Sequence, residues 1–194
     1  MFKCIEAKDK ELIKEIYRFR AEITCNELGS VKKEECIDGM EIDEYDRYSI
    51  QYAFFDEKDR LAACVRLVHH SDIGYPTFNA LKIDPKERVN LLPDDKMAEL
   101  SRIFIGKDYR CIKNTKEIID LVKLNAGKRM AEMGIEYSYG ALEKSFLRLL
   151  AILKMPYRPI GPYQQYGGRM RAPCIMSTEE LLELNKELFL ETVS

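Results

Sequence analysis

The sequence has few of the residues that usually build metal centres or disulfide frameworks. Its 194 residues include no tryptophan and two histidines, His69 and His70. No two cysteines form a C-x-x-C pair, so a zinc site or a disulfide scaffold has little support. We therefore expect no metal site and reduced thiols buried in the core. The six cysteines are Cys4, Cys25, Cys36, Cys64, Cys111 and Cys174.

An excess of charge of one sign and a long apolar segment are also missing. The formal net charge is −2, which gives no overall electrostatic attraction to nucleic acid or to an anionic membrane. No apolar run approaches the length of a membrane span, and the N-terminal MFKCIEAKDKE has no signal-peptide core. These absences predict a cytoplasmic protein with no membrane span and no nucleic-acid partner.

The composition that remains is that of an ordinary globular protein. Apolar residues make up 46% of the chain and charged residues 33%. A chain of 194 residues without repeats or a Gly/Ser linker favours a single domain over residues 1–194 with a sizeable core.

The N-terminal half predicts a helix, a charged loop and a β-hairpin. Apolar residues at helical spacing indicate a helix over residues 8–28, with Asp9 as its N-cap and Gly29 as its stop. Residues 30–46 form a polar, irregular loop. Two β-like runs, 49–56 and 60–68, read as a hairpin, and residues 69–95, with three prolines, read as a loop with short helical turns.

The C-terminal half alternates strands with helices. It predicts strands at 99–106 and 135–142, a helix from a capping pair at Asn114 and Glu117 to about Met133, and a helix through Leu149 to Lys154. Two short strands are expected around Gly167-Gly168, and a capping box at Ser177 and Glu180 opens a C-terminal helix. This order indicates an α/β fold, a mixed sheet with helices on both faces.

Charged side chains within apolar or turn-like segments are the candidate functional residues. They are Arg20 in the first helix, Glu41, Asp43 and Asp46 in the loop, Arg66 in the run AACVRLV, and Glu99 and Arg102 at a strand start. An alternating strand would place Val65 and Arg66 on opposite faces. Two interpretations are open. The charges form ion pairs that hold the loop to the sheet edge, or they line a polar cleft where an arginine binds substrate and a glutamate takes a proton.

In this order, the residues resemble the acyl-homoserine lactone synthases and their relatives, the N-acyl amino acid synthases. The shared pattern is Arg20, Glu41, Asp43, Asp46, Arg66, Glu99, Ser101 and Arg102. The resemblance implies a GNAT-like (acyl-CoA N-acyltransferase) α/β/α sandwich with a mixed β-sheet that splits between its fourth and fifth strands. It also implies that the 4′-phosphopantetheine arm of an acyl carrier protein lies in that split as the acyl donor, with no bound cofactor.

The resemblance further implies the roles of individual residues. The acyl tail would enter a pocket lined by Phe104, Leu142, Phe146 and Leu149, although an ordinary core is an equal alternative for these four. Strand amides near Arg102, Ile103 and Phe104 would stabilise the oxyanion, and Arg20 or Arg102 could pair with an acceptor carboxylate. Asp43, Asp46, Arg66 and Ser101 would shape the substrate cleft, and Glu99 would act as the base.

Departures from the lactone synthases favour the N-acyl amino acid branch. Thr24 and Ser30 stand where those enzymes place aromatic residues that accept S-adenosylmethionine. The segment GKDYRCIKNTKE has one glycine rather than a pyrophosphate-binding loop, so a carrier protein fits better than coenzyme A. Basic side chains in and near this segment could meet the acidic carrier or be a solvated face: Lys107, Arg110, Lys113 and Lys116.

The sequence therefore predicts an N-acyltransferase that moves a long-chain acyl group from acyl carrier protein to the α-amine of an amino acid. Tyrosine is the acceptor suggested by analogy. Two alternatives stay open: an acyl-homoserine lactone synthase that uses S-adenosylmethionine, and a non-catalytic module that binds acyl carrier protein.

Overall fold

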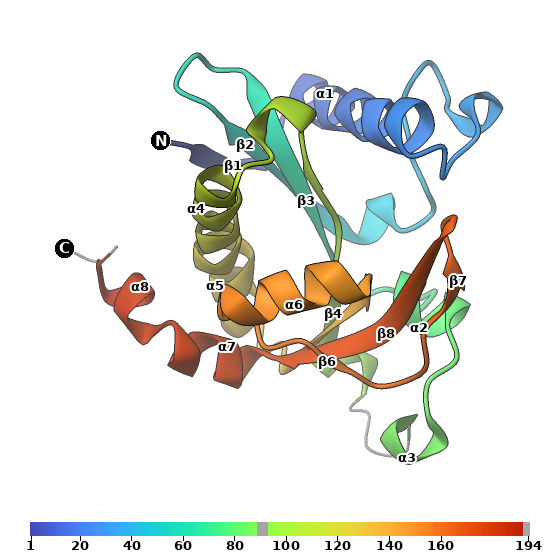
Figure 1. Cartoon of the computed structure of the whole chain (residues 1–194), viewed down its shortest axis with the longest axis vertical. Coiled ribbons are helices and arrows are strands. Elements are labelled where there is room, and N and C mark those ends of the chain that lie inside the picture. Colours follow the sequence, from blue (N-terminus) through green and yellow to red (C-terminus); the bar gives the residue numbers. More distant parts are fainter. Residues whose placement is uncertain (89–92, 192–194) are drawn as a thin grey trace.

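The computed structural model describes residues 1–88 and 93–191 as a mixed sheet with helices on both faces (Figure 1). The strands follow the order β1-β2-β3-β4-β5-β8-β6, and β7 pairs with β8. Neighbouring strands are antiparallel except β4 and β5, which are parallel. The strands are β1 Lys3–Ala7, β2 Ser49–Phe55, β3 Leu61–His69, β4 Met97–Ile105, β5 Tyr137–Leu142, β6 Arg158–Pro159, β7 Gln164–Tyr166 and β8 Arg169–Ser177.

The helices form one layer on each side of this sheet. α1 covers one face of β2 and β3, whereas α4, α5, α6 and α7 contribute to the core on the other face. Two of the helical rods contain π-helical turns, Glu22–Glu27 after α1 and Lys123–Gly127 between α4 and α5. The α-helices are α1 Lys10–Ala21, α2 Pro76–Ala80, α3 Pro85–Arg88, α4 Ile112–Val122, α5 Lys128–Glu132, α6 Lys144–Ile152, α7 Thr178–Leu184 and α8 Lys186–Glu191.

The alternation of side chains along β2 and β3 explains the two cores. Tyr52 and Phe54 point into the large core against α4, and Ala53 points to the α1 side. On β3, Val65 joins the large core and Arg66 lies on the opposite face, as the sequence predicts. Both faces are buried, so these strands are apolar on both sides except where a charge has a partner.

The sheet divides between β4 and β5. Their parallel pairing covers only Met97–Glu99 against Tyr137–Tyr139. In the described part of the chain no further β4–β5 pair forms beyond Glu99, and the two strands line opposite walls of a cavity. The predicted split between the fourth and fifth strands is therefore confirmed.

A β-bulge at Arg102 changes the direction of the side chains on β4. Arg66 pairs with Ser101 and Cys64 with Phe104, so two residues of β4 lie opposite the single residue Val65. Arg102 has a φ of 51°, a left-handed conformation that costs a residue other than glycine about 1–3 kcal/mol. The bulge places the side chains of Ser101 and Arg102 on the same face as Arg66.

Most of the predicted elements are confirmed. Asp9 caps α1, and Gly29 follows the π-helical turn with a φ of 59°. The loop 69–95 contains α2 and α3, and its residues 89–92 lie outside the described part of the chain. Ser177 accepts a hydrogen bond from the Glu180 amide at the start of α7. Over the described residues, no helix is long and apolar enough to cross a membrane.

One strand was missed, and two sequence predictions are wrong. The short edge strand β1 was not predicted, although Phe2 and Cys4 alternate toward the core. The Asn114–Glu117 capping pair does not form, because α4 begins at Ile112 and Cys111 is its N-cap. Of the two strands around Gly167-Gly168, β8 is not short: it spans nine residues and pairs with β5, β6 and β7.

Candidate active site

A cluster of three arginines and three carboxylates lies on the α1 side of the sheet, beside the bulge. The arginines come from α1, β3 and β4, and all the carboxylates come from the loop 30–46. We call it the acid–arginine cluster; its members are Arg20, Arg66, Arg102, Glu41, Asp43 and Asp46.

Each arginine of the cluster contacts two carboxylates. Arg20 donates to Glu41 at 2.5 Å and to Asp46 at 2.6 and 3.0 Å. Arg66 donates to Asp43 at 2.5 Å and to Asp46 at 3.1 Å. Arg102 donates to Glu41 at 2.7 Å and to Asp43 at 3.0 Å. The interpretation in which ion pairs hold the loop is therefore confirmed, and the loop is fixed to the face of the sheet rather than to its edge.

Two carboxylates of the cluster, Glu41 and Asp46, are too acidic to take a proton near neutral pH. Burial disfavours the charged form of Glu41, but Arg102 and Arg20 outweigh it and lower its pKa to about 2. Burial likewise opposes ionisation of Asp46, yet the hydrogen bonds and charge of Arg20 lower its pKa. Both groups are held as anions by their partners, so we assign the cluster a positioning role.

Glu99 is in a different environment, on the same face of β4. Its carboxylate accepts a hydrogen bond from the Thr77 amide at 2.8 Å and from the Thr77 hydroxyl at 2.9 Å. No ion pair among the described residues includes it, and its exposed fraction is 2%. Burial raises the pKa of Glu99 to about 7, against the opposing hydrogen bonds from Thr77. A carboxylate with this pKa can exchange a proton at neutral pH.

The short helix α2 positions Glu99. Pro76 occupies its first turn, and Thr77 directs both its amide and its hydroxyl at the carboxylate. Tyr75, directly before the helix, donates from its hydroxyl to the Met97 carbonyl at 2.6 Å and ties the segment to β4. Thr77 is not recognisable from the sequence, because the loop 69–95 has no periodicity that would place it beside the strand.

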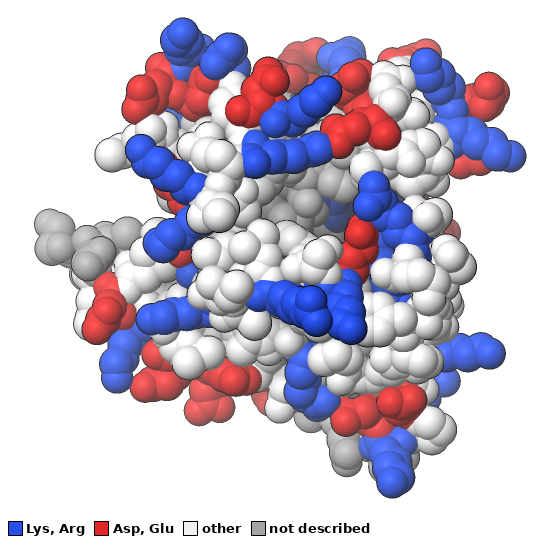
Figure 2. All heavy atoms as spheres, viewed as in Figure 1, with Lys and Arg blue, Asp and Glu red and all other residues white. Residues whose placement is uncertain are grey.

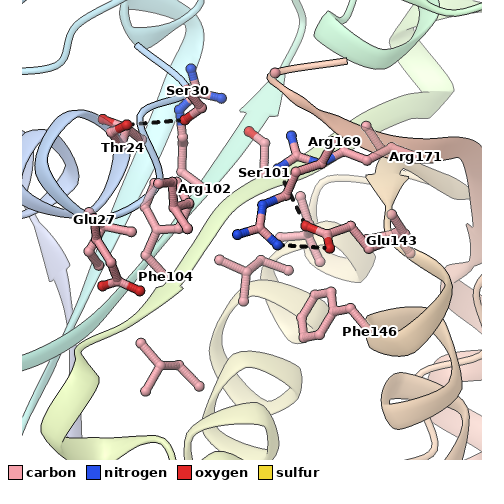
Figure 3. A pocket seen from close by; sticks show the side chains of 18 of the residues that line it. Thr24, Glu27, Ser30, Ser101, Arg102, Phe104, Glu143, Phe146, Arg169 and Arg171 are labelled. Carbon is pink, nitrogen blue, oxygen red and sulfur yellow. Dashed lines mark hydrogen bonds and ion pairs between the residues drawn. The ribbon is translucent and has the colours of Figure 1, made fainter. Parts of the chain in front are cut away.

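A cavity of about 730 Å³ fills the split between β4 and β5 (Figure 3). This volume lies within the usual range for small-molecule sites. Its polar end contains Glu99, Ser101 and Arg102, and the π-helical turn after α1 closes one side with Ile23 and Thr24. The four residues predicted for the acyl pocket line it from β4, β5 and α6: Phe104, Leu142, Phe146 and Leu149. Ile103 of β4, predicted for its amide, lines it as well.

Several predicted substrate-binding residues do not reach the cavity. Arg20 and Arg66 are fully buried, and they and the carboxylates Asp43 and Asp46 are not among the residues that line it. The prediction that Arg20 could pair with an acceptor carboxylate does not fit, because Glu41 and Asp46 already occupy its guanidinium.

The four residues predicted to meet a carrier protein differ in position. Arg110 lines the cavity and forms an ion pair with Glu27 of the π-helical turn, which lowers the pKa of Glu27. Lys116 pairs with Asp120 at 2.5 Å. Lys107 and Lys113 are exposed. Figure 2 shows Lys and Arg side chains on both sides of the hollow that opens on this face.

Residues of the β7–β8 hairpin were not predicted as part of the site. Tyr166, Arg169 and Arg171 line the cavity together with Glu143, which precedes α6 (Figure 3). The available signal was the alternate basic pattern R-M-R directly after Gly167-Gly168, which places both arginines on one face of a strand.

Not all of the cysteines are buried in the core, contrary to the prediction from the sequence. Cys64 and Cys174 are buried thiols, and burial raises the pKa of each to about 12. Cys111 is exposed, and Cys25 and Cys36 are partly exposed free thiols whose sulfur atoms lie 2.6 Å apart. Within the described ranges, no three metal-ligating side chains are grouped for an ion.

The comparisons with known proteins point to one family. The family model for autoinducer synthases matches residues 5–162. No curated protein matches the chain at the level of sequence.

Solved structures share the fold over nearly the whole chain. The CoA-dependent acyl-homoserine lactone synthase BjaI, solved with SAM and isopentyl-CoA, has a TM-score of 0.69 at 18% identity, covering 97% of this chain and 89% of its own. FeeM, an N-acyl amino acid synthase from uncultured soil microbes, has a TM-score of 0.68 at 12% identity, with 95% and 94% covered. An acetyltransferase of the GNAT family from Staphylococcus aureus has a TM-score of 0.57 at 15% identity, with 92% and 99% covered.

Proposed function

The chain belongs to the autoinducer synthase family, and on this premise we propose that it is an N-acyltransferase that makes N-acyl amino acids. In this proposal a long-chain fatty-acyl group moves from the 4′-phosphopantetheine arm of an acyl carrier protein to the α-amine of an amino acid. The observation that carries the proposal is a buried carboxylate with a pKa of about 7, Glu99, at the polar end of a largely apolar cavity inside a split sheet.

Glu99 supports the chemistry of amine acylation. The amine must be uncharged to attack the thioester carbonyl, and the nitrogen loses a proton as the new amide forms. With a pKa of about 7, Glu99 is partly ionised at neutral pH and can accept that proton, directly or through water. Arg102, fixed by Glu41 and Asp43, places a positive charge near the same end of the cavity. The thiol of the arm is the leaving group.

The diverging strands support an extended donor. β4 and β5 face each other across the cavity with no strand between them beyond Glu99. An arm that contains amide groups can lie there as a short extra strand and hydrogen-bond to strand edges. Phe104, Phe146 and Leu149 then provide an apolar lining for the acyl tail.

The start of α4 supports a carrier-protein donor over coenzyme A. Glycine-rich loops bind pyrophosphate through closely approaching backbone amides at a helix start. Here the corresponding segment contains Gly106 alone, and the Cys111 sulfur already accepts from the Asn114 amide at 3.5 Å. Lys107 and Lys113 remain exposed nearby for contact with an acidic carrier.

Two small polar residues support an amino acid acceptor over S-adenosylmethionine. Thr24 and Ser30 line the cavity at the places where the resemblance to lactone synthases would put aromatic rings. The Thr24 hydroxyl is bound to the Arg20 carbonyl at 2.8 Å, and the Ser30 hydroxyl to the Thr24 carbonyl at 3.2 Å. Neither side chain offers a flat surface on which an adenine could stack.

Product identification tests this proposal. The purified protein would be incubated with long-chain acyl carrier protein or the matching acyl-CoA, the amino acids and S-adenosylmethionine, and the products analysed by mass spectrometry. We expect an N-acyl amino acid, N-acyl tyrosine first among them, formed from the carrier-bound donor. An acyl-homoserine lactone with methylthioadenosine would instead support the lactone synthase. Carrier binding without any product would support a non-catalytic module.

A further inference from the structure

The positive charges around the cavity are almost all neutralised by the protein itself. In the acid–arginine cluster, three arginines meet three carboxylates, and Arg102 is the cluster arginine that reaches the cavity. Nη2 of Arg66 has no hydrogen-bond partner in the described structure, but Arg66 does not line the cavity. Arg110 is paired with both carboxylate oxygens of Glu27.

The hairpin arginines, Arg169 and Arg171, are the exception. Both line the cavity and both approach one carboxylate, Glu143. The distance from Arg169 Nη1 to Glu143 Oε2 is 3.2 Å, and from Arg171 Nη2 to Glu143 Oε1 it is 3.8 Å. Two positive charges therefore share one negative charge, and Arg171 has the weaker contact with it.

The surroundings of Arg171 favour an anionic partner. Its side chain is 21% exposed, and burial lowers its pKa, which is the signature of a guanidinium without full compensation. Its guanidinium carbon lies 5.8 Å from the Tyr166 ring. A Cβ at Gly167 would lie 3.1 Å from Arg171 Nη1, so glycine leaves room for the arginine beneath the turn. A partly buried arginine with spare donors binds carboxylates well, because its planar fork can make two parallel hydrogen bonds.

We propose that Arg171, assisted by Arg169, binds the carboxylate of the amino acid acceptor and of the N-acyl product. This inference rests on the proposed function, because it takes the acceptor to be an amino acid. Figure 3 shows the hairpin arginines and Glu143 on one side of the cavity and Arg102 on the other, with Ser101 between them. A carboxylate bound at Arg171 would leave the α-amine toward Glu99.

The position of the hairpin favours the acceptor over the donor phosphate. The pKa of Tyr166 is raised by burial and also by the charge of Glu99, so this hairpin lies within electrostatic range of the proposed base. Arg110 and Thr115, by contrast, line the part of the cavity beside the start of α4. The two ends of the cavity thus present different cations. At the end near Glu99, Arg102 is paired with Glu41 and Asp43, whereas Arg171 has only the 3.8 Å contact with Glu143.

Equilibrium binding of two matched ligands tests the inference without turnover. Isothermal titration would compare N-dodecanoyl-tyrosine with N-dodecanoyl-tyramine, which is the same molecule without the carboxylate. One charged hydrogen-bonded contact corresponds to a preference of roughly 10- to 100-fold for the tyrosine ligand. Arg171→Gln is expected to remove most of that preference and to leave the affinity for the tyramine ligand within about twofold of wild type. Arg169→Gln should reduce the preference for the tyrosine ligand by a smaller factor.

Two further variants make the test specific. Glu143→Gln removes the competing carboxylate, so the preference for the tyrosine ligand should increase, whereas a merely structural role of Glu143 predicts weaker binding of both ligands. Arg158→Gln on β6 is the control, because Arg158 pairs with Glu87 and does not line the cavity. Melting temperatures of all variants identify any that fail to fold. If Arg171→Gln does not fold, Arg169→Gln takes its place in the binding comparison, because the Arg169 side chain is more exposed.

Three results would overturn the inference. The first is equal affinity of wild type for the two ligands. The second is an equal loss of affinity for both ligands in Arg171→Gln. The third is an Arg171→Gln protein that loses affinity for the acyl donor alone. The proposed function fails separately, when wild type forms no N-acyl amino acid in the product assay. A protein that distinguishes the two ligands through Arg171 but makes no product would keep the carboxylate site and lose the reaction.

Discussion

Replacing Thr77 by valine should shift the pH dependence of the reaction upward. The Thr77 hydroxyl donates to Glu99 Oε1 at 2.9 Å, inside a site where Glu99 is 2% exposed. Valine has nearly the same shape and no donor, whereas the second hydrogen bond, from the backbone amide of residue 77 at 2.8 Å, remains. Since a hydrogen bond to the charged form lowers the pKa of an acid, its loss raises the pKa of Glu99.

The size of the shift follows from the kind of bond that is lost. A hydrogen bond to a charged group contributes about 1.5–3 kcal/mol, and about 1.4 kcal/mol corresponds to one pKa unit. The acidic limb of the pH–rate profile of kcat/KM, expected at a pKa of about 7 in wild type, should therefore move up by about 1–2 units in Thr77→Val. Near neutral pH, Thr77→Val should react about 5- to 50-fold more slowly, because about half of Glu99 is ionised in wild type, and it should recover at high pH.

The assay measures product formation against pH by mass spectrometry, with saturating donor and limiting acceptor. Thr178→Val is the matched control, because Thr178 is also buried but its hydroxyl has no hydrogen-bond partner among the residues that the structure describes. It should leave the profile unchanged. A limb that stays near its wild-type position in Thr77→Val, or moves down, would refute the assignment of Glu99 as the titrating base.

Three further perturbations test the packing around the site. Asp46→Asn removes the carboxylate shared by Arg20 and Arg66, and should lower the free energy of unfolding in urea by about 3–5 kcal/mol. Lys123→Met removes a buried ammonium that is bound to Asp120, to the Leu153 carbonyl and to Asn185. It should lower the free energy of unfolding by about 1–3 kcal/mol and speed amide hydrogen exchange in α7. Leu149→Trp narrows the acyl end of the cavity and should favour shorter donors in competition assays, each excluded methylene costing about 0.8 kcal/mol.

Local patterns in the sequence predict most of the helices and strands. Strand alternation predicts that Arg66 and Val65 face opposite ways, and the structure shows this. The order of charged residues along the chain indicates the family, and the split between β4 and β5 follows from it. The edge strand β1 is missed because five residues of mixed polarity give a weak periodic signal.

The site is less accessible from sequence, because its contacts join segments far apart in the chain. Glu99 is recognised as a candidate base, but its partner Thr77 lies 22 residues earlier, in a loop without periodicity. The bulge that turns Arg102 toward Glu41 depends on a strained backbone conformation that arginine rarely adopts. From the sequence, Arg171 looks like a basic residue on an exposed strand, because only the folded hairpin places it in the lining of the cavity.

Glu99→Gln, compared with wild type in the product assay at about pH 8, tests the central claim most directly, because the base should be ionised above its pKa. We predict that wild type forms an N-acyl amino acid and that Glu99→Gln forms at least about 100-fold less. The folded-state pKa of Glu99 is raised, so its ionisation costs stability as the pH rises from the unfolded value through about 7. Glu99→Gln should therefore be more stable than wild type at about pH 8, the pH of the assay, which separates loss of the base from loss of the fold. A Glu99→Gln protein that makes product at the wild-type rate would contradict the account.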